Sequence, residues 1–201
     1  MIRREVILAY LRERQDCQSE ALHAMIDRAI ALARSEIKVK SIYRVVECTA
    51  SKDGGSVMLD GHCFNSPYLA GHLQPCQKAV LLAVTLGPAA DRLVRRESLS
   101  GMAPAAVMQA VLAEMTEEAC DALEESIAAE VRAMYPRATF VQRYSPGYSD
   151  FSLEYQRDMF ALLDITKRIG VGLTNGLLMV PTKTVTAVLG VCIEAPELPC
   201  A

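Results

Sequence analysis

Apolar residues in the first forty positions of the chain recur at helical spacing. Residues 2–14 are interpreted as a short helix, and a second helix is predicted in SEALHAMIDRAIALARSE, residues 19–36. Ser19 is placed to cap the second helix. Its apolar residues fall on one face: Leu22, Ile26, Ile30 and Ala33. The pattern therefore predicts an N-terminal helical region, about residues 1–40.

Two segments with strand-like composition come next. SIYRVVECTA, residues 41–50, and SVMLDG, residues 56–61, are rich in β-branched and apolar side chains and are separated by an Asp-Gly-Gly turn signal. They are predicted to form paired strands. AVLLAVTLG, residues 79–87, is a continuous apolar run, which is typical of a strand buried on both faces. Because Pro88 is well placed to begin a helix, residues 88–97 are predicted to be helical.

The longest periodic segment covers residues 104–136 and is predicted to be a single helix that Pro136 ends. An apolar stripe along it is formed by Cys120, Leu123, Ile127, Val131 and Met134. Four acidic residues lie beside this stripe: Glu117, Asp121, Glu124 and Glu125. The acidic residues are compatible with a solvated helix face or with one side of a binding site.

The last third of the chain mixes both kinds of element. ATFVQRYS, residues 138–145, is interpreted as a strand, and residues 152–165 as an amphipathic helix. Two further strands are predicted at 171–174 and 184–192, around a bend marked by glycine and proline. Helices and strands do not alternate strictly, so the predicted fold class is α+β, with helices packed around a mixed, largely antiparallel sheet. We expect a single domain over residues 1–201, with a core that contains a ligand cleft at about 41–192.

The composition limits the classes of protein to which the chain can belong. Of the 201 residues, 51% are hydrophobic and 22% are charged, which is typical of a globular chain. The formal net charge is -3 and there is no basic block, so a nucleic-acid partner is not expected. The N-terminus lacks the long apolar run and cleavage site of a signal peptide. Since no segment has the length of a membrane span, we expect a cytoplasmic protein without membrane contact.

The chain contains seven cysteines and no CxxC motif. The odd number and the spacing favour neither a disulfide framework nor a zinc ribbon. His62, Cys63, His72 and Cys76 form the one set from which a metal site can be drawn, but their spacing matches no familiar pattern. We therefore predict no metal site and expect the cysteines to behave as small buried hydrophobic residues in a reducing compartment.

The segment RYSPGYSDFSLEYQ, residues 143–156, contains more chemistry than a turn requires. The turn residues around Gly147 permit a close approach to the backbone. Arg143 can hold a carboxylate through two parallel hydrogen bonds, and Tyr148 offers a ring for an aromatic base. An alternative needs no ligand: Arg143 pairs with Asp150 or Glu154, and Tyr148 caps the core. The residues by themselves leave both interpretations open.

Residues 143–190 resemble the C-terminal half of the activation domain of vitamin B12-dependent methionine synthase, and more closely the stand-alone small proteins of that family. The resemblance depends on an Arg-x-x-x-Gly-Tyr signature, formed by Arg143, Gly147 and Tyr148, and on the LT…M-x-P-x-x-T-V-T segment, Leu173 to Thr186. AVLLAVTLGPAADRLVRR, residues 79–96, is also similar to the stand-alone version. The likeness covers roughly residues 76–191, and Gly176 departs from it because a serine or similar residue is expected there.

The resemblance implies a site for S-adenosylmethionine. Arg143 would hold the methionyl carboxylate, Ser145 and Gly147 would offer backbone contacts, and Tyr148 would help to hold the adenosine end. The family also uses an acidic residue on the helix before the signature. Asp121 matches best, and Glu125, one turn later, is the alternative; a carboxylate there suits the ammonium group of the ligand.

The resemblance also implies an accessory function, the reductive reactivation of a cobalamin-dependent methionine synthase that has become inactive Co(II). The chain lacks the Asp-x-His-x-x-Gly motif, so cobalamin is expected on the partner and not on this chain. The electron would come from a flavodoxin-like donor. Another corrinoid methyltransferase remains an alternative partner. With three histidines and no nucleophile–base pair, no catalytic residue is assigned and an independent enzyme is not favoured.

Overall fold

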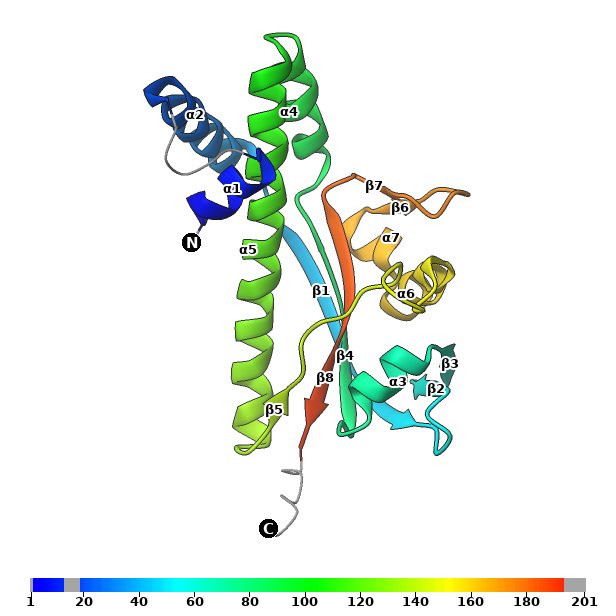
Figure 1. The fold of residues 1–201 in the computed structure, drawn as a ribbon. Coiled ribbons are helices and arrows are strands. Elements are labelled where there is room, and N and C mark those ends of the chain that lie inside the picture. Colours follow the sequence, from blue (N-terminus) through cyan, green and yellow to red (C-terminus); the bar gives the residue numbers. More distant parts are fainter. Residues whose placement is uncertain (1, 13–18, 194–201) are drawn as a thin grey trace.

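The computed structural model describes residues 2–12 and 19–193, which form helices around one six-stranded sheet (Figure 1). The strand order is β3-β2-β1-β4-β8-β5, and each pairing in this sheet is antiparallel. The fold class predicted from the sequence, α+β with a largely antiparallel sheet, is confirmed. The strands are β1 (Lys40–Ala50), β2 (Ser56–Leu59), β3 (His62–Asn65), β4 (Lys78–Thr85), β5 (Thr139–Phe140) and β8 (Thr184–Cys192).

Strand β4 lies at the centre of the sheet, as its continuous apolar run predicted. It pairs with β1 from Lys78↔Glu47 to Thr85↔Lys40 and with β8 over its whole length. All its residues after Lys78 are buried. Since side chains of a strand alternate between the two faces, both faces must be covered. The predicted β1–β2 pairing is also confirmed.

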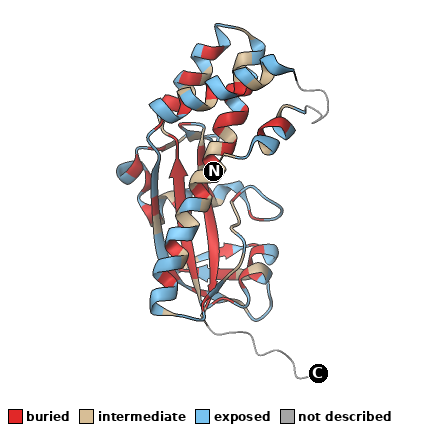
Figure 2. Cartoon of the chain, turned by 90° about the vertical axis from the view of Figure 1, so that its left-hand side faces the viewer, coloured by how far each residue is buried: buried red, intermediate tan, exposed pale blue. Residues whose placement is uncertain are grey.

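The long helix α5 (Met102–Met134) covers one face of the sheet (Figures 1 and 2). Its residues Cys120, Ile127 and Val131 pack in one cluster with Val80 and Leu82 of β4. The opposite face carries α3 (Pro67–Leu73), α6 (Gln156–Leu163) and α7 (Ile165–Ile169), which pack with Leu81 and Ala83. Even and odd positions of β4 therefore belong to different cores, as the two-residue period of a strand requires.

A third cluster forms the helical end of the molecule. It joins α1 (Arg4–Tyr10), α2 (Glu20–Glu36), α4 (Pro88–Ser98) and the N-terminal half of α5. Figure 2 shows buried residues on the sides of these helices that face one another. The predicted cap is present, because Ser19 Oγ accepts a hydrogen bond from Leu22 N. None of the helices in the described residues is long and apolar enough to cross a membrane.

The segment before the signature differs from the predicted strand at 138–145. Regular pairing covers only β5, after which Val141 N bonds to Gly190 O and Tyr144 forms an isolated bridge with Val188. Gln142 and Arg143 between them belong to no strand. The predicted helix at 152–165 is also divided, into η2 (Leu153–Tyr155) and α6, and Asp164 after α6 has the left-handed conformation. Helix α7 begins at Ile165 and lies otherwise beyond the predicted range.

Four elements were not predicted: β3, α3, α7 and the second strand of a small hairpin. The hairpin pairs β6 (Gly172–Leu173) with β7 (Met179–Val180), and a cis peptide bond follows between Val180 and Pro181. The predicted strands 171–174 and 184–192 correspond to β6 and β8. The hairpin extends from the side of the molecule that carries α6 and α7 (Figure 1).

Candidate functional site

The candidate site is a cleft of about 860 Å³ between α5, the segment 142–148, α3 and the start of β8. The β6–β7 hairpin contributes Leu177, Leu178 and Met179 to one wall. The volume lies within the usual range for small-molecule sites, about 300–1,000 Å³. Elements far apart in the sequence meet here, because β5 pairs with β8 in the sheet and α5 covers one face of that sheet.

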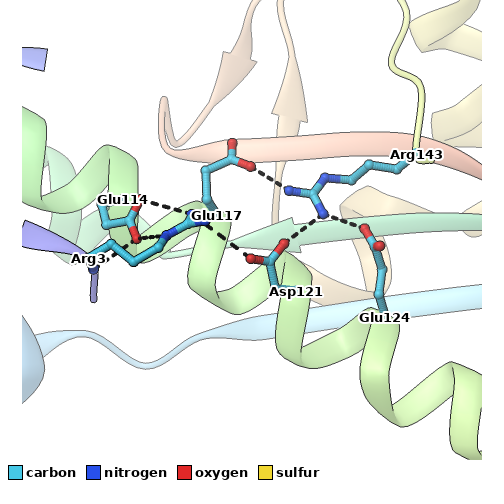
Figure 3. A network of polar contacts seen from close by, with 6 residues as sticks. All are labelled: Arg3, Glu114, Glu117, Asp121, Glu124 and Arg143. Carbon is cyan, nitrogen blue, oxygen red and sulfur yellow. Dashed lines mark hydrogen bonds and ion pairs between the residues drawn. The ribbon is translucent and has the colours of Figure 1, made fainter. Parts of the chain in front are cut away.

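Arg143 contacts three carboxylates of α5 (Figure 3). Arg143, Glu117 and Asp121 line the cleft and form its charged wall. Arg143 Nη1 donates to Asp121 Oδ1 at 2.8 Å and to Glu124 Oε1 at 2.5 Å, and Arg143 Nη2 donates to Glu117 Oε2 at 2.5 Å. Residues four and three positions apart share one helix face, which explains why these three carboxylates converge. The alternative partners of Arg143 considered from the sequence, Asp150 and Glu154, are not among its contacts in the described residues.

The charged network extends along α5 to the N-terminal segment (Figure 3). The fully buried side chain of Glu114 accepts from Arg3 Nε at 2.7 Å and Nη2 at 3.2 Å, and Arg3 Nη2 lies 4.0 Å from Asp121. The six side chains drawn in Figure 3 are four carboxylates and two guanidinium groups. The network therefore has an excess of negative charge, which favours a positively charged ligand group.

The pKa values of the two arginines reflect this field. Burial acts to lower the pKa of Arg143, but hydrogen bonds and charges from Glu124, Asp121 and Glu117 outweigh it and raise the pKa above its ordinary value. The hydrogen bond to Glu114 raises the pKa of Arg3. Both groups stay charged at any physiological pH, so the network offers permanent donors as well as carboxylates.

The turn after Arg143 explains the glycine of the signature. Gly147 has φ +102°, a conformation that side chains resist, and an added Cβ would lie 3.2 Å from Leu153 Cδ1. Its N–H donates to Phe151 O at 2.7 Å, and Phe151 N donates to Tyr148 O at 3.0 Å. This closed turn directs Tyr148 outward, where 67% of its surface is exposed. The alternative that Tyr148 caps the core is therefore wrong.

Four of the residues proposed from the sequence meet in the cleft: Asp121, Arg143, Ser145 and Tyr148 all line it. Gly147 lies within the same turn. Glu125 is exposed and is not among the lining residues. Because successive residues turn by about 100° around a helix, Glu125 points away from the face that carries Glu124.

Several residues of the cleft were not recognised from the sequence. Glu117 lines the cleft, and Glu124 contacts Arg143 without lining it. Both were noted only as part of an acidic face, although their spacing with Asp121 was a usable signal. Tyr68 and His72 come from α3, and Tyr144 lies inside the signature. Thr186 donates to Gln156 Oε1 at 2.7 Å and fixes the base of the cleft. No periodicity in a single sequence links these segments to one another.

The residues considered from the sequence as a possible metal site contact separate partners. His62 Nδ1 lies 3.0 Å from Asp158 Oδ1, His72 Nε2 lies 2.6 Å from Gln142 O, and Cys76 Sγ lies 3.1 Å from Cys192 Sγ. Across residues 2–12 and 19–193, no three His, Cys, Asp or Glu side chains are grouped so that they could hold a metal ion. Cys17 and Cys200 lie outside the described residues.

Comparisons with known proteins identify the family of this chain. Residues 79–197 match the family model described as "Vitamin B12 dependent methionine synthase, activation domain". This match covers more than half of the chain. The chain therefore belongs to the activation-domain family of vitamin B12-dependent methionine synthase, and the resemblance inferred from the sequence is confirmed.

Among solved structures, the crystal structure of the MetH reactivation domain bound to AdoHcy has the same fold. It superposes with a TM-score of 0.62 at 15% sequence identity, over 91% of this chain and 70% of that chain. A search among curated proteins found no match. The likeness to the solved structure at this identity establishes the fold, and the ligand named in its title belongs to that protein.

Proposed function

We propose that this protein binds S-adenosylmethionine in the cleft and supports the reductive reactivation of a separate cobalamin-dependent methionine synthase. Membership of the activation-domain family and the fold shared with an AdoHcy-bound reactivation domain support the proposal. The observation that carries it is the direct contact of Arg143 with Asp121 at the wall of a cleft. That pair offers the two charges that an amino-acid group requires.

The charges of the ligand fit this wall. S-adenosylmethionine carries a carboxylate, an ammonium group and a sulfonium group. The three contacts of Arg143 engage three of the five guanidinium donors, so a ligand carboxylate can bind alongside them or replace one carboxylate contact. Asp121 and Glu117 then face the ammonium and sulfonium groups. The excess negative charge of the network favours this net positive ligand over its neutral product, S-adenosylhomocysteine.

The remaining contacts come from the turn. Ser145 and Gly147 offer backbone groups at the edge of the cleft, and Tyr148 presents an exposed ring beside it. In this assignment, the chain binds and orients the methyl donor and performs no covalent step itself. Cobalamin on the partner supplies the nucleophile that accepts the methyl group, and a flavodoxin-like protein supplies the electron. Asp121 is the acidic residue assigned to the ammonium group; Glu125 points elsewhere.

Reactivation tests the proposal directly. A methionine synthase core that lacks an activation domain is loaded with cobalamin, oxidised to Co(II), and mixed with S-adenosylmethionine and a low-potential reductant. We expect methionine synthesis to recover when this protein is added. Equal recovery without the protein, or with Arg143→Ala and Tyr148→Ala combined, would contradict the proposal. Recovery of a different corrinoid methyltransferase in the same assay, and not of the synthase core, would identify the alternative partner.

A further inference from the structure

Three aromatic rings form a stack that leads from the core into the cleft. The ring of Phe151 is fully buried, and the ring of Tyr144 stacks on it with centroids 6.1 Å apart and planes at 15°. Tyr68 stacks on Tyr144 at 4.9 Å and 27°. Tyr68 and Tyr144 both line the cleft, and 53% of the Tyr68 surface is exposed. The outer ring of the stack therefore forms part of the cleft wall.

The helix that carries Tyr68 is fastened to the segment around the signature at two points. Asp150 accepts hydrogen bonds from Ser66 Oγ and, at 3.1 Å, from Tyr68 N. Ser66 is fully buried and also caps α3 by accepting from Leu69 N at 3.1 Å. At the other end, the ring of His72 lies 2.6 Å from Gln142 O. These bonds hold α3 in place beside residues 142–150, so the Tyr68 ring is positioned before any ligand enters.

The aromatic wall and the charged wall belong to the same cleft. A ligand with a charged amino-acid end and a planar ring can contact both at once. Phenol rings stack on purines because both have extended π faces, and one such contact typically changes affinity about 5-fold to 100-fold. α3 lies before the segment matched by the family model, which begins at residue 79. Tyr68 thus lies outside the segment that matches the family model.

We propose that Tyr68, backed by Tyr144, is the stacking surface for the purine ring of the bound S-adenosyl compound, and thereby selects nucleoside ligands over simple sulfonium amino acids. This inference rests on the proposed function for its ligand. Asp150 has a positioning role, because it accepts hydrogen bonds from Ser66 Oγ and from the backbone N–H of Tyr68.

Binding is measured by titration calorimetry with three ligands: S-adenosylmethionine, S-methylmethionine, which has no purine, and 5′-methylthioadenosine, which has no amino-acid end. We expect Tyr68→Ala and Tyr68→Leu to weaken both purine ligands about 5-fold to 100-fold. Neither variant should change the affinity for S-methylmethionine. Tyr68→Phe should resemble wild type. Tyr10→Ala is the matched control, since Tyr10 is 54% exposed on α1 and lines a different cavity.

The outcomes separate the two proposals. If wild type binds methylthioadenosine through Tyr68 but not S-adenosylmethionine, the stacking surface stands and the proposed function fails. If Tyr68→Ala and Tyr68→Leu bind S-adenosylmethionine as wild type does, or weaken all three ligands equally, the inference is overturned. Absence of binding of both purine ligands to wild type overturns both. Thermal unfolding of each variant tests whether the protein remains folded. If Tyr68→Ala does not fold, Tyr68→Leu serves in its place, because leucine keeps an apolar side chain against Tyr144.

Discussion

Arg143 shows how much depends on the shape of one side chain. Its two terminal nitrogens contact three carboxylates through donors that the planar guanidinium holds in fixed directions. The charge alone does not define the site, because a lysine ammonium is a single point. The tight turn at Gly147 then places Tyr148 beside the same cleft.

Replacement of Arg143 by lysine separates charge from geometry. We expect Arg143→Lys to remain folded, because a positive charge stays beside the carboxylates. S-adenosylmethionine should bind about tenfold to a hundredfold more weakly, since a charged hydrogen bond contributes about 1.5–3 kcal/mol. Titration calorimetry and thermal unfolding measure the two effects. Arg132→Lys on α5 is the control, because Arg132 lies over Phe140 and outside the cleft. Equal affinity of wild type and Arg143→Lys would show that the guanidinium does not hold the ligand.

Strand β8 is the element that joins the site to the core. It pairs with β4 along its length and with β5 and Tyr144 on its other side, and it contributes Thr184 and Thr186 to the cleft. Gly190 allows this close packing: an added Cβ would lie 2.5 Å from Val141 Cγ2, 2.6 Å from Cys76 Sγ and 2.7 Å from Leu73 Cδ2.

A methyl group at position 190 therefore overpacks the interface between β8, α3 and the segment before Arg143. We expect Gly190→Ala to lower the free energy of unfolding by about 1–3 kcal/mol, as overpacking of a dense core does. Gly71→Ala is the matched control, for which the free energy of unfolding should change in the opposite direction. Gly71 is exposed within α3 and an added Cβ meets nothing within 4 Å, so alanine should stabilise the helix by about 0.5–1 kcal/mol. Urea unfolding measures both variants; a Gly190→Ala protein as stable as wild type would contradict the packing argument.

At the scale of the whole molecule, α5 connects the helical end with one face of the sheet. Its N-terminal half packs within the helical end, its C-terminal half covers the sheet, and the face between them carries the carboxylates of the site. Buried thiols lie in the cores on both sides of the sheet. Burial raises the pKa of Cys48 to about 12, with a further effect from Cys192, and burial also raises the pKa of Cys120 to about 12.

These thiols make stability depend on pH in the alkaline range. Above about pH 9 the cysteines of the unfolded chain ionise, whereas Cys48 and Cys120 stay protonated in the folded protein. The unfolded state then binds fewer protons, so stability falls as pH rises from about 9 towards 12, by about 1.4 kcal/mol per pH unit for each thiol. Urea unfolding between pH 7 and 10.5 should show this decline.

Cys120→Ala isolates one thiol. The variant should be less stable than wild type at pH 7 because of the cavity it creates, but its stability should decline less steeply above pH 9, by about 1.4 kcal/mol per pH unit. Parallel pH profiles for the two proteins would mean that Cys120 ionises alike in the folded and unfolded states.

Local patterns in the sequence were sufficient for most of the individual elements. The helical period of residues 19–36 and 104–136 and the apolar run of β4 predicted α2, α5 and the central strand, because these elements bury whole faces. The Arg143–Tyr148 signature was recognised by its resemblance to a family. α3 and β3 were not predicted, since short elements contain too few residues for a period to emerge.

Only the tertiary structure decided which side chains meet. Asp150 was considered as the partner of Arg143 but binds Ser66 and Tyr68, and Arg143 instead contacts three carboxylates on α5. Asp121 and Glu125 were both candidates, and the rotation of the helix against the sheet places only Asp121 in the cleft. A sequence pattern identifies a polar face but carries no information about what lies opposite it. The packing of α5 and α3 against the sheet determines that, because buried apolar stripes set the orientation of every polar residue beside them.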